Sequence, residues 1–176
     1  MSSLFVQHER QRRMRSGLLA VAMWCLGLLG FGLYLQHVVG LVPCPMCIVQ
    51  RYALVLVLCL SVLAALLSKG LAGRLLGVLA VLLALGGAFT AARQSWLQWY
   101  PPEILACGRD FFGMIESFPL QRAIPMIFKG SGDCTAVDWT WLGLSIANWS
   151  FLNFCALVVV LLWLVFPPKR IAPTAF

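Results

Sequence analysis

Four long apolar runs constrain this chain more than any other feature of its sequence. They lie at about residues 17–36, 48–67, 75–92 and 146–166. Each is close to the roughly 20 residues that a helix needs to cross a bilayer. The runs are continuous and do not alternate, which predicts helices and excludes barrel strands. We therefore expect an all-α membrane protein, a single domain built as a four-transmembrane-helix bundle.

Composition excludes the main soluble classes. Hydrophobic residues make up 61% of the chain and charged residues only 11%, where a soluble domain carries about 25% charged residues. The net charge is +7, but the 13 lysines and arginines, with the exception of Arg51, stand at the chain ends and between the apolar runs. This distribution argues against a nucleic-acid partner and leaves the lipid bilayer. No run contains Asp or Glu, which argues against a proton-coupled transporter.

The first run could also be a cleaved signal peptide. A basic stretch precedes it, and Gly30-Phe31-Gly32 imitates a cleavage site. The run is longer than the apolar part of a usual signal peptide. We therefore predict a retained span.

Basic residues in the short connections predict the orientation of the bundle. The connection at about residues 37–47 has no basic residue, and the one at about 94–145 has three against five acidic residues. Cytoplasmic loops carry the excess of Lys and Arg. Both termini are therefore expected in the cytoplasm and the two cysteine-bearing loops outside. Eight basic residues lie on the side assigned to the cytoplasm: Arg10, Arg12, Arg13, Arg15, Lys69, Arg74, Lys169 and Arg170.

Tryptophans and small residues add detail to the bundle. Five of the seven tryptophans flank the long outer loop, which is typical of an interfacial belt. Small residues recur in the third run at helical spacing, which favours a packing seam between helices. A groove for a lipid or quinone is the alternative interpretation of that face. The small residues are Gly77, Ala80, Ala84, Gly87 and Ala91.

Seven cysteines fall into two groups. Three lie inside spans and are expected to be buried small hydrophobic residues: Cys25, Cys59 and Cys155. The other four lie in the outer loops, as Cys44-Pro45-Met46-Cys47 and as Cys107 and Cys134 with 26 residues between them. Two even pairs facing an oxidising compartment predict disulfide chemistry.

The Cys44/Cys47 pair has the local pattern of a redox switch. Pro45 suits the first position of a helix, which would place Cys44 at the N-cap and Cys47 in the first turn. The positive end of the helix favours a thiolate there. Arg51 follows Cys47 by four residues, on the same helix face, where it would favour the Cys47 thiolate. Snorkelling to the interface is the alternative role for Arg51.

Static disulfides and a metal site remain as alternatives. A staple between Cys107 and Cys134 would be worth about 3.6 kcal/mol by chain entropy, whereas a tight Cys-x-x-Cys is a poor staple. Structural zinc sites of four cysteines normally use two Cys-x-x-Cys knuckles. The second pair lacks that spacing, so no metal is expected.

The motifs together resemble the disulfide bond formation protein B (DsbB) family. Its pattern is matched by Pro43-Cys44-x-x-Cys47 with Arg51, by Tyr100-Pro101, and by Gly132-Asp133-Cys134. The resemblance covers about residues 17–166. It implies an enzyme of the bacterial inner membrane that reoxidises a periplasmic DsbA-type thiol oxidase. The electrons would pass to a membrane quinone, either ubiquinone or menaquinone.

The same resemblance implies a role for each cysteine. Cys107 would form the mixed disulfide with the partner, and Cys134 would pass the electrons to Cys44. Cys47 would face the quinone, with Arg51 beside it. The apolar segment between Cys107 and Cys134 would lie on the membrane surface or cover the bundle.

Three other functions remain to be separated from this one. Vitamin K epoxide reductases share four helices and two cysteine pairs, but in that family the Cys-x-x-Cys comes in the last span. A non-enzymatic membrane scaffold would use both pairs as structural bridges. A metal carrier would bind metal through the same cysteines.

Overall fold

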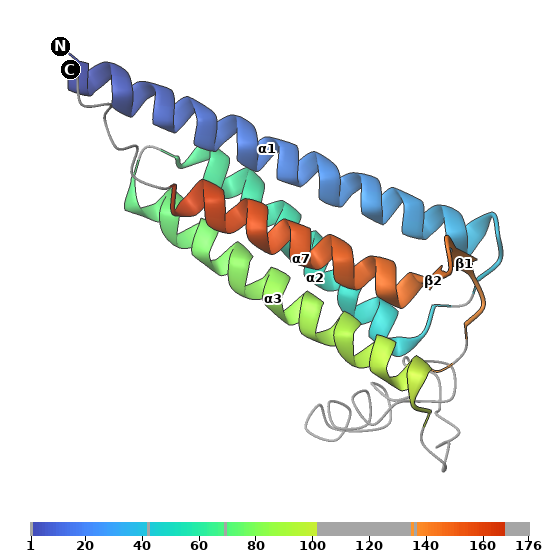
Figure 1. Ribbon diagram of the computed structural model, residues 1–176. Helices are drawn as coiled ribbons and strands as arrows, with labels where there is room; N and C mark the ends of the chain where they lie inside the picture. Colours follow the sequence, from blue (N-terminus) through green and yellow to red (C-terminus); the bar gives the residue numbers. More distant parts are fainter. Residues whose placement is uncertain (1, 42, 69, 102–134, 136, 168–176) are drawn as a thin grey trace, which may run out of the picture.

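Four long helices make up most of the described part of the chain, as the sequence predicts. The computed structural model describes residues 2–41, 43–68, 70–101, 135 and 137–167. Its helices are α1 (Ser2–His37), α2 (Pro45–Leu66), α3 (Leu71–Trp99) and α7 (Ile146–Val165), with a short hairpin of β1 (Thr140–Trp141) and β2 (Leu144–Ser145). All four helices are long and apolar enough to cross a membrane. The expected four-helix bundle is confirmed (Figure 1).

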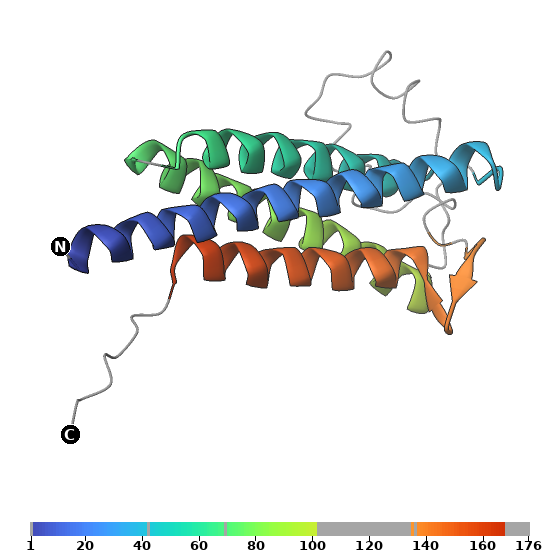
Figure 2. The same cartoon turned by 90° about the horizontal axis from the view of Figure 1, so that it is seen from above.

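The helices form a closed ring in which each packs on two others. Contacts join α1 to α2, α2 to α3, α3 to α7, and α7 back to α1. Two views show successive helices running in opposite directions (Figures 1 and 2). We call the end holding the start of α1 and the end of α7 the basic end. The opposite end, with the start of α2 and the hairpin, is the cysteine end.

Two helices extend beyond the apolar runs that predicted them. Helix α1 begins at Ser2, because the residues before Gly17 include Gln, Glu, Arg and Met, which are good helix formers. Its 36 residues span about 54 Å, which exceeds the roughly 30 Å hydrocarbon core. Helix α3 continues to Trp99, past the expected end at Ala92. Residues 94–99 are therefore helical, although the sequence analysis assigned them to a loop.

The small face of α3 is a packing seam, as expected. All five of its predicted small residues are buried. A Cβ added at Gly77 would lie 2.7 Å from Val165 Cγ2, and one at Gly87 would overlap the Phe154 ring. Since both contacts join α3 to α7, only glycine permits this close approach of the two helices.

The cysteines inside the spans differ in their surroundings. Cys25 is fully buried, Cys155 is half-buried, and Cys59 is exposed on the outer face of the bundle. The expectation of burial is confirmed for Cys25 and wrong for Cys59. A membrane span can face lipid with its apolar side chains, so the hydrophobicity of a residue does not place it inside the bundle.

The hairpin before α7 was not expected from the sequence. Leu142 and Gly143 connect its strands with φ of 52° and 77°, as in the two-residue turns that join antiparallel strands. Ser145 then caps α7, because its Oγ accepts from the Asn148 backbone N–H at 3.4 Å. The same hydroxyl donates to Gln98 Oε1 on α3 at 2.5 Å. These bonds hold the hairpin against the cysteine end.

Candidate active site

The Cys-Pro-Met-Cys segment begins α2 in the way that its sequence predicts. Cys44 is the N-cap, with extended φ and ψ of −71° and 160°, and Pro45 is the first helical residue. The Cys44 Sγ accepts from the Cys47 backbone N–H at 3.4 Å. The sulfur therefore replaces the oxygen of a usual N-cap residue in satisfying an unpaired helix N–H.

The two sulfur atoms of this segment lie side by side in a largely buried place. Their separation is 2.9 Å, and Cys44 is buried while Cys47 is half-buried. Met46 and Leu97 are both buried and pack in the same cluster. Because both thiols belong to the first turn of α2, a disulfide can form and break there with little motion of the helix.

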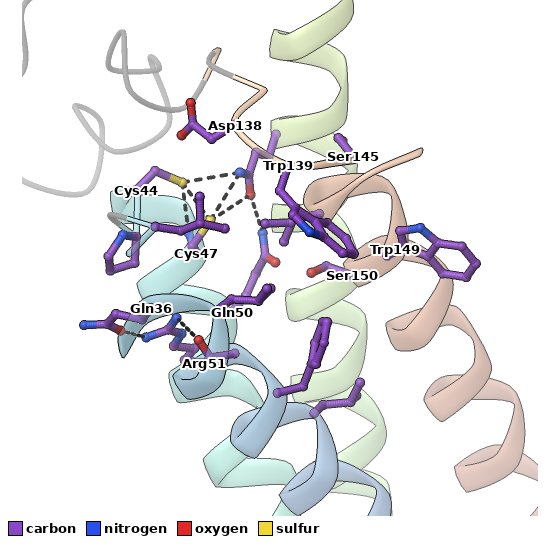
Figure 3. Close-up of a pocket in the computed structure, with 18 of the residues that line it drawn as sticks. Gln36, Cys44, Cys47, Gln50, Arg51, Asp138, Trp139, Ser145, Trp149 and Ser150 are labelled. Atoms are coloured by element: carbon purple, nitrogen blue, oxygen red, sulfur yellow. Dashed lines mark hydrogen bonds between the residues drawn. The ribbon is translucent and has the colours of Figure 1, made fainter. Parts of the chain in front are cut away.

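A glutamine from α3 contacts both sulfurs. Gln94 Nε2 donates to the Sγ atoms of Cys44 and Cys47, each at 3.3 Å. Its Oε1 accepts from Gln50 Nε2 at 2.8 Å, and these bonds are among the dashed lines of Figure 3. Gln94 is 3% exposed and Gln50 is 5% exposed. The thiol pair is thus connected to a chain of two buried amides.

Arg51 lies one turn deeper in α2 than Cys47. Its Nη1 donates to Gln36 Oε1, and its Nη2 donates to the Gly32 carbonyl at 3.0 Å. Figure 3 shows the guanidinium turned towards Gln36 on α1. Two of the five guanidinium N–H groups are therefore engaged within the described part of the chain. The arginine keeps further donors for a ligand.

One cavity of about 520 Å³ brings these residues together. Cys44, Cys47, Gln50, Arg51 and Gln94 line it, and apolar side chains from α1, α7 and the hairpin segment supply most of the remaining wall. Aromatic residues form part of that wall, with the Phe31 and Trp139 rings packed edge to face at 6.1 Å between centroids. This combination suits an apolar ring that carries a few hydrogen-bond acceptors.

The structure brings together three of the five predicted site residues. Cys44, Cys47 and Arg51 share the cavity, whereas Cys107 and Cys134 lie outside the described residues, as does the apolar segment between them. The sequence analysis missed Gln94 and Gln50. Gln94 is a polar residue just beyond the third apolar run, and this position was the only available signal for it. The sequence analysis had assigned that position to a loop.

Comparison with known proteins identifies the family. Residues 14–164 match the family described as "Disulfide bond formation protein DsbB". The chain belongs to the disulfide bond formation protein B family. A relative from a Polaromonas species, named disulfide bond formation protein B, is 66% identical over 152 residues, which cover 86% of this chain and 90% of the relative. The Paracidovorax citrulli protein of that name is 59% identical over 92% of this chain and 93% of its own length.

Membership in the DsbB family establishes the class of reaction. The protein is a quinone-dependent thiol oxidoreductase of a multi-pass membrane fold, and it acts in disulfide bond formation by reoxidising DsbA. A non-enzymatic scaffold is thereby excluded. The vitamin K epoxide reductase type and the metal carrier are set aside on the same finding.

Proposed function

We propose that Cys44 and Cys47 are the thiol pair that delivers electrons to the quinone, and that the cavity at the cysteine end receives its ring. The observation that carries this proposal is the position of both sulfurs and Arg51 on the wall of one cavity. A volume of about 520 Å³ lies within the range of small-molecule sites. The ligand is of the ubiquinone or menaquinone type, and it accepts two electrons and two protons when it binds there.

Arg51 is the residue that we propose to hold the quinone. A guanidinium that donates to a carbonyl oxygen stabilises that oxygen more strongly as negative charge develops on it. Gln36 and Gly32 hold the Arg51 side chain between α1 and α2. This support limits the freedom of the side chain before a ligand arrives.

We further propose that Cys107 and Cys134 form the pair that meets the partner, a DsbA-type thiol oxidase. A partner thiolate attacks Cys107, and the electron pair of the broken bond leaves on Cys134. The Cys134 thiolate then attacks Cys44, so that Cys47 is released as a thiolate at the cavity. The order rests on the family resemblance.

The orientation that we propose places the cysteine end in the periplasm. Described basic residues at the basic end include Arg12, Arg13, Arg15 and Arg74, and the positive-inside rule puts these residues in the cytoplasm. Both termini would then be cytoplasmic in the bacterial inner membrane. The partner would reach the cysteines from the oxidising side.

Replacement of the two loop cysteines tests the order of exchange. Cys134→Ser leaves Cys107 as a free thiol, so this variant is mixed with the oxidised partner. The Cys107 thiolate attacks the partner's disulfide, and the mixed disulfide should be long-lived because the internal resolving thiol is gone. Cys107→Ser should abolish oxidation of the partner and leave quinone binding intact. Non-reducing electrophoresis and thiol titration measure these outcomes.

Cys155→Ser is the matched control, since Cys155 lies half-buried in α7 and lines no part of the cavity. It should turn over at the normal rate. Normal turnover of reduced partner by Cys107→Ser would show that the proposed order is wrong.

A further inference from the structure

We propose that Gln94 stabilises the thiolate that Cys47 becomes during exchange, and that Gln50 is a positioning residue that fixes the direction of the Gln94 amide. The inference rests on the proposed role of the Cys44/Cys47 pair. It assigns a function to two glutamines that the family resemblance left without one.

The contacts of Gln94 give its amide a direction. An amide side chain has a donating NH₂ and an accepting carbonyl. Gln50 Nε2 donates to the Gln94 carbonyl oxygen at 2.8 Å, and the Gln94 NH₂ lies 3.3 Å from each sulfur. The same carbonyl oxygen accepts from the Cys47 thiol at 3.7 Å, a longer contact that is lost when Cys47 gives up its proton. Since both glutamines are at least 95% buried, water competes little for these bonds.

A donor in this place favours the charged product of the exchange step. When a thiolate attacks Cys44, a new S–S bond forms and the Cys44–Cys47 bond breaks. The electron pair of the broken bond leaves on the Cys47 Sγ as a thiolate, which can only accept hydrogen bonds. In the poorly solvated wall of the cavity, an N–H group aimed at that sulfur lowers the cost of the charge.

Gln94 and Arg51 differ in two respects. The guanidinium of Arg51 carries a fixed positive charge, whereas the amide of Gln94 is a neutral donor. The Gln94 amide contacts both sulfurs, whereas the hydrogen bonds of Arg51 go to Gln36 and Gly32 on α1. The geometry thus divides the work, with Gln94 acting on the thiolate and Arg51 on the quinone.

The alkylation rate of reduced Cys47 tests this division without quinone or partner. Full-length protein in quinone-free nanodiscs is treated with iodoacetamide, and peptide mass spectrometry follows Cys47 separately from the other six cysteines. Because only the thiolate reacts, Gln94→Leu should react about tenfold more slowly at pH 7, the scale of one charge-assisted hydrogen bond. The difference should close as the pH is raised towards 10.

Two further variants separate electrostatics from packing. Gln94→Glu keeps an acceptor for Gln50 but presents a carboxylate to the sulfurs, so it should slow the reaction at pH 7 more than Gln94→Leu does. Gln50→Met changes no atom in contact with sulfur, yet it frees the Gln94 amide to turn. We expect it to slow alkylation about threefold.

Ser95→Ala is the matched control on α3. Ser95 is buried, and within the described residues its hydroxyl has no hydrogen-bond partner, so the rate should stay within twofold of the parent. An unchanged rate in Gln94→Leu at pH 7 would overturn the proposal. A slowing that is equal at every pH would also overturn it, because that pattern indicates altered access.

The proposed function is tested apart from this inference by the Cys47→Ser variant. Loss of quinone reduction in Cys47→Ser supports the thiol pair as the electron donor whatever Gln94 does. Retained quinone reduction in Cys47→Ser would contradict the proposal that Cys44 and Cys47 deliver electrons to the quinone. The effect of Gln94 on the alkylation rate of Cys47 would not be affected by that result.

Discussion

The basic end and the cysteine end of the bundle hold their helices together by different means. At the basic end, α3 approaches α7 through residues with little or no side chain, and Gly77 packs directly on Val165. At the cysteine end, the same helix contributes Gln94, Gln98 and Ser95 to the buried or cavity-lining positions. The first arrangement maximises contact between surfaces, and the second keeps polar groups and space available between the helices.

This difference has a physical consequence for substitutions. A close-packed seam resists added volume, since neighbouring side chains must move to accommodate it. A cavity lined by hydrogen-bonding groups tolerates volume better but is sensitive to the loss of a donor. Added volume in the seam at the basic end should therefore change stability, whereas loss of the hydrogen-bond donors of Arg51 or Gln94 at the cysteine end should change turnover.

The largest expected effect is on the cysteine end. Arg51→Ala should fold and insert but need about ten- to a hundredfold more quinone for half-maximal rate, since a hydrogen bond to a charged group is worth about 1.5–3 kcal/mol. Arg51→Lys should be partly active because it keeps the charge and loses the planar fork. Steady-state kinetics against quinone concentration measure both variants.

Thiol exchange between Cys107 and the partner, followed without quinone, is the control for Arg51. It should be nearly untouched in Arg51→Ala. If the rate of Arg51→Ala depends on quinone concentration as the parent's does, Arg51 does not bind the quinone and only snorkels to the interface. The basic end and the cysteine end would then not differ in function as described.

A substitution in the seam should show the opposite pattern. In Gly77→Ala the new methyl group lies 2.7 Å from Val165 Cγ2 in the unrelaxed structure, so Val165 or the helix must shift. We expect a loss of about 1–3 kcal/mol in the free energy of unfolding, with quinone dependence unchanged. Unfolding in mixed micelles gives the first quantity and steady-state kinetics the second.

Gly86→Ala is the matched control for the seam, because a Cβ at Gly86 meets no atom within 4 Å. It should be neutral or slightly stabilising, since alanine is the better helix former. Equal losses of stability at positions 77 and 86 would contradict the account of the seam.

The smallest expected effect concerns the start of α7. Ser145→Ala removes the acceptor for the Asn148 N–H and the donor to Gln98. Loss of an N-cap costs about 1 kcal/mol. Thermal unfolding and turnover measured together show whether the hairpin belongs to the structural or to the functional part of the cysteine end. Ser145→Thr keeps a hydroxyl and should retain most of the stability.

The sequence predicted the four spans well because hydropathy measures what the bilayer requires. It placed the start of α1 and the end of α3 too close to the apolar runs, since a helix does not stop where its side chains become polar. That error hid Gln94, which stands two residues past the expected end of the third span at Ala92.

The cysteine motif predicted the start of α2 correctly, because proline and the N-cap position are local properties. The contact between Gln94 and the sulfurs joins residues 50 and 47 positions apart in the chain. Such a contact depends on the depth at which α2 and α3 are aligned, which no local pattern encodes. The hairpin before α7 was missed for a different reason: its turn has a leucine at φ of 52°, where Asn, Asp or Gly is the usual signal.

Gly87 connects the packing of the bundle to the wall of the cavity. The Phe154 ring lies over this glycine and also forms part of the wall of the cavity. Any larger residue at position 87 must push the ring away, and the cavity is one direction in which it can move. In the site proposed for the quinone, the room for ring substituents would thus depend partly on this glycine. A lineage could adjust its preference between a one-ring and a two-ring electron acceptor there, while its reactive groups stay as they are.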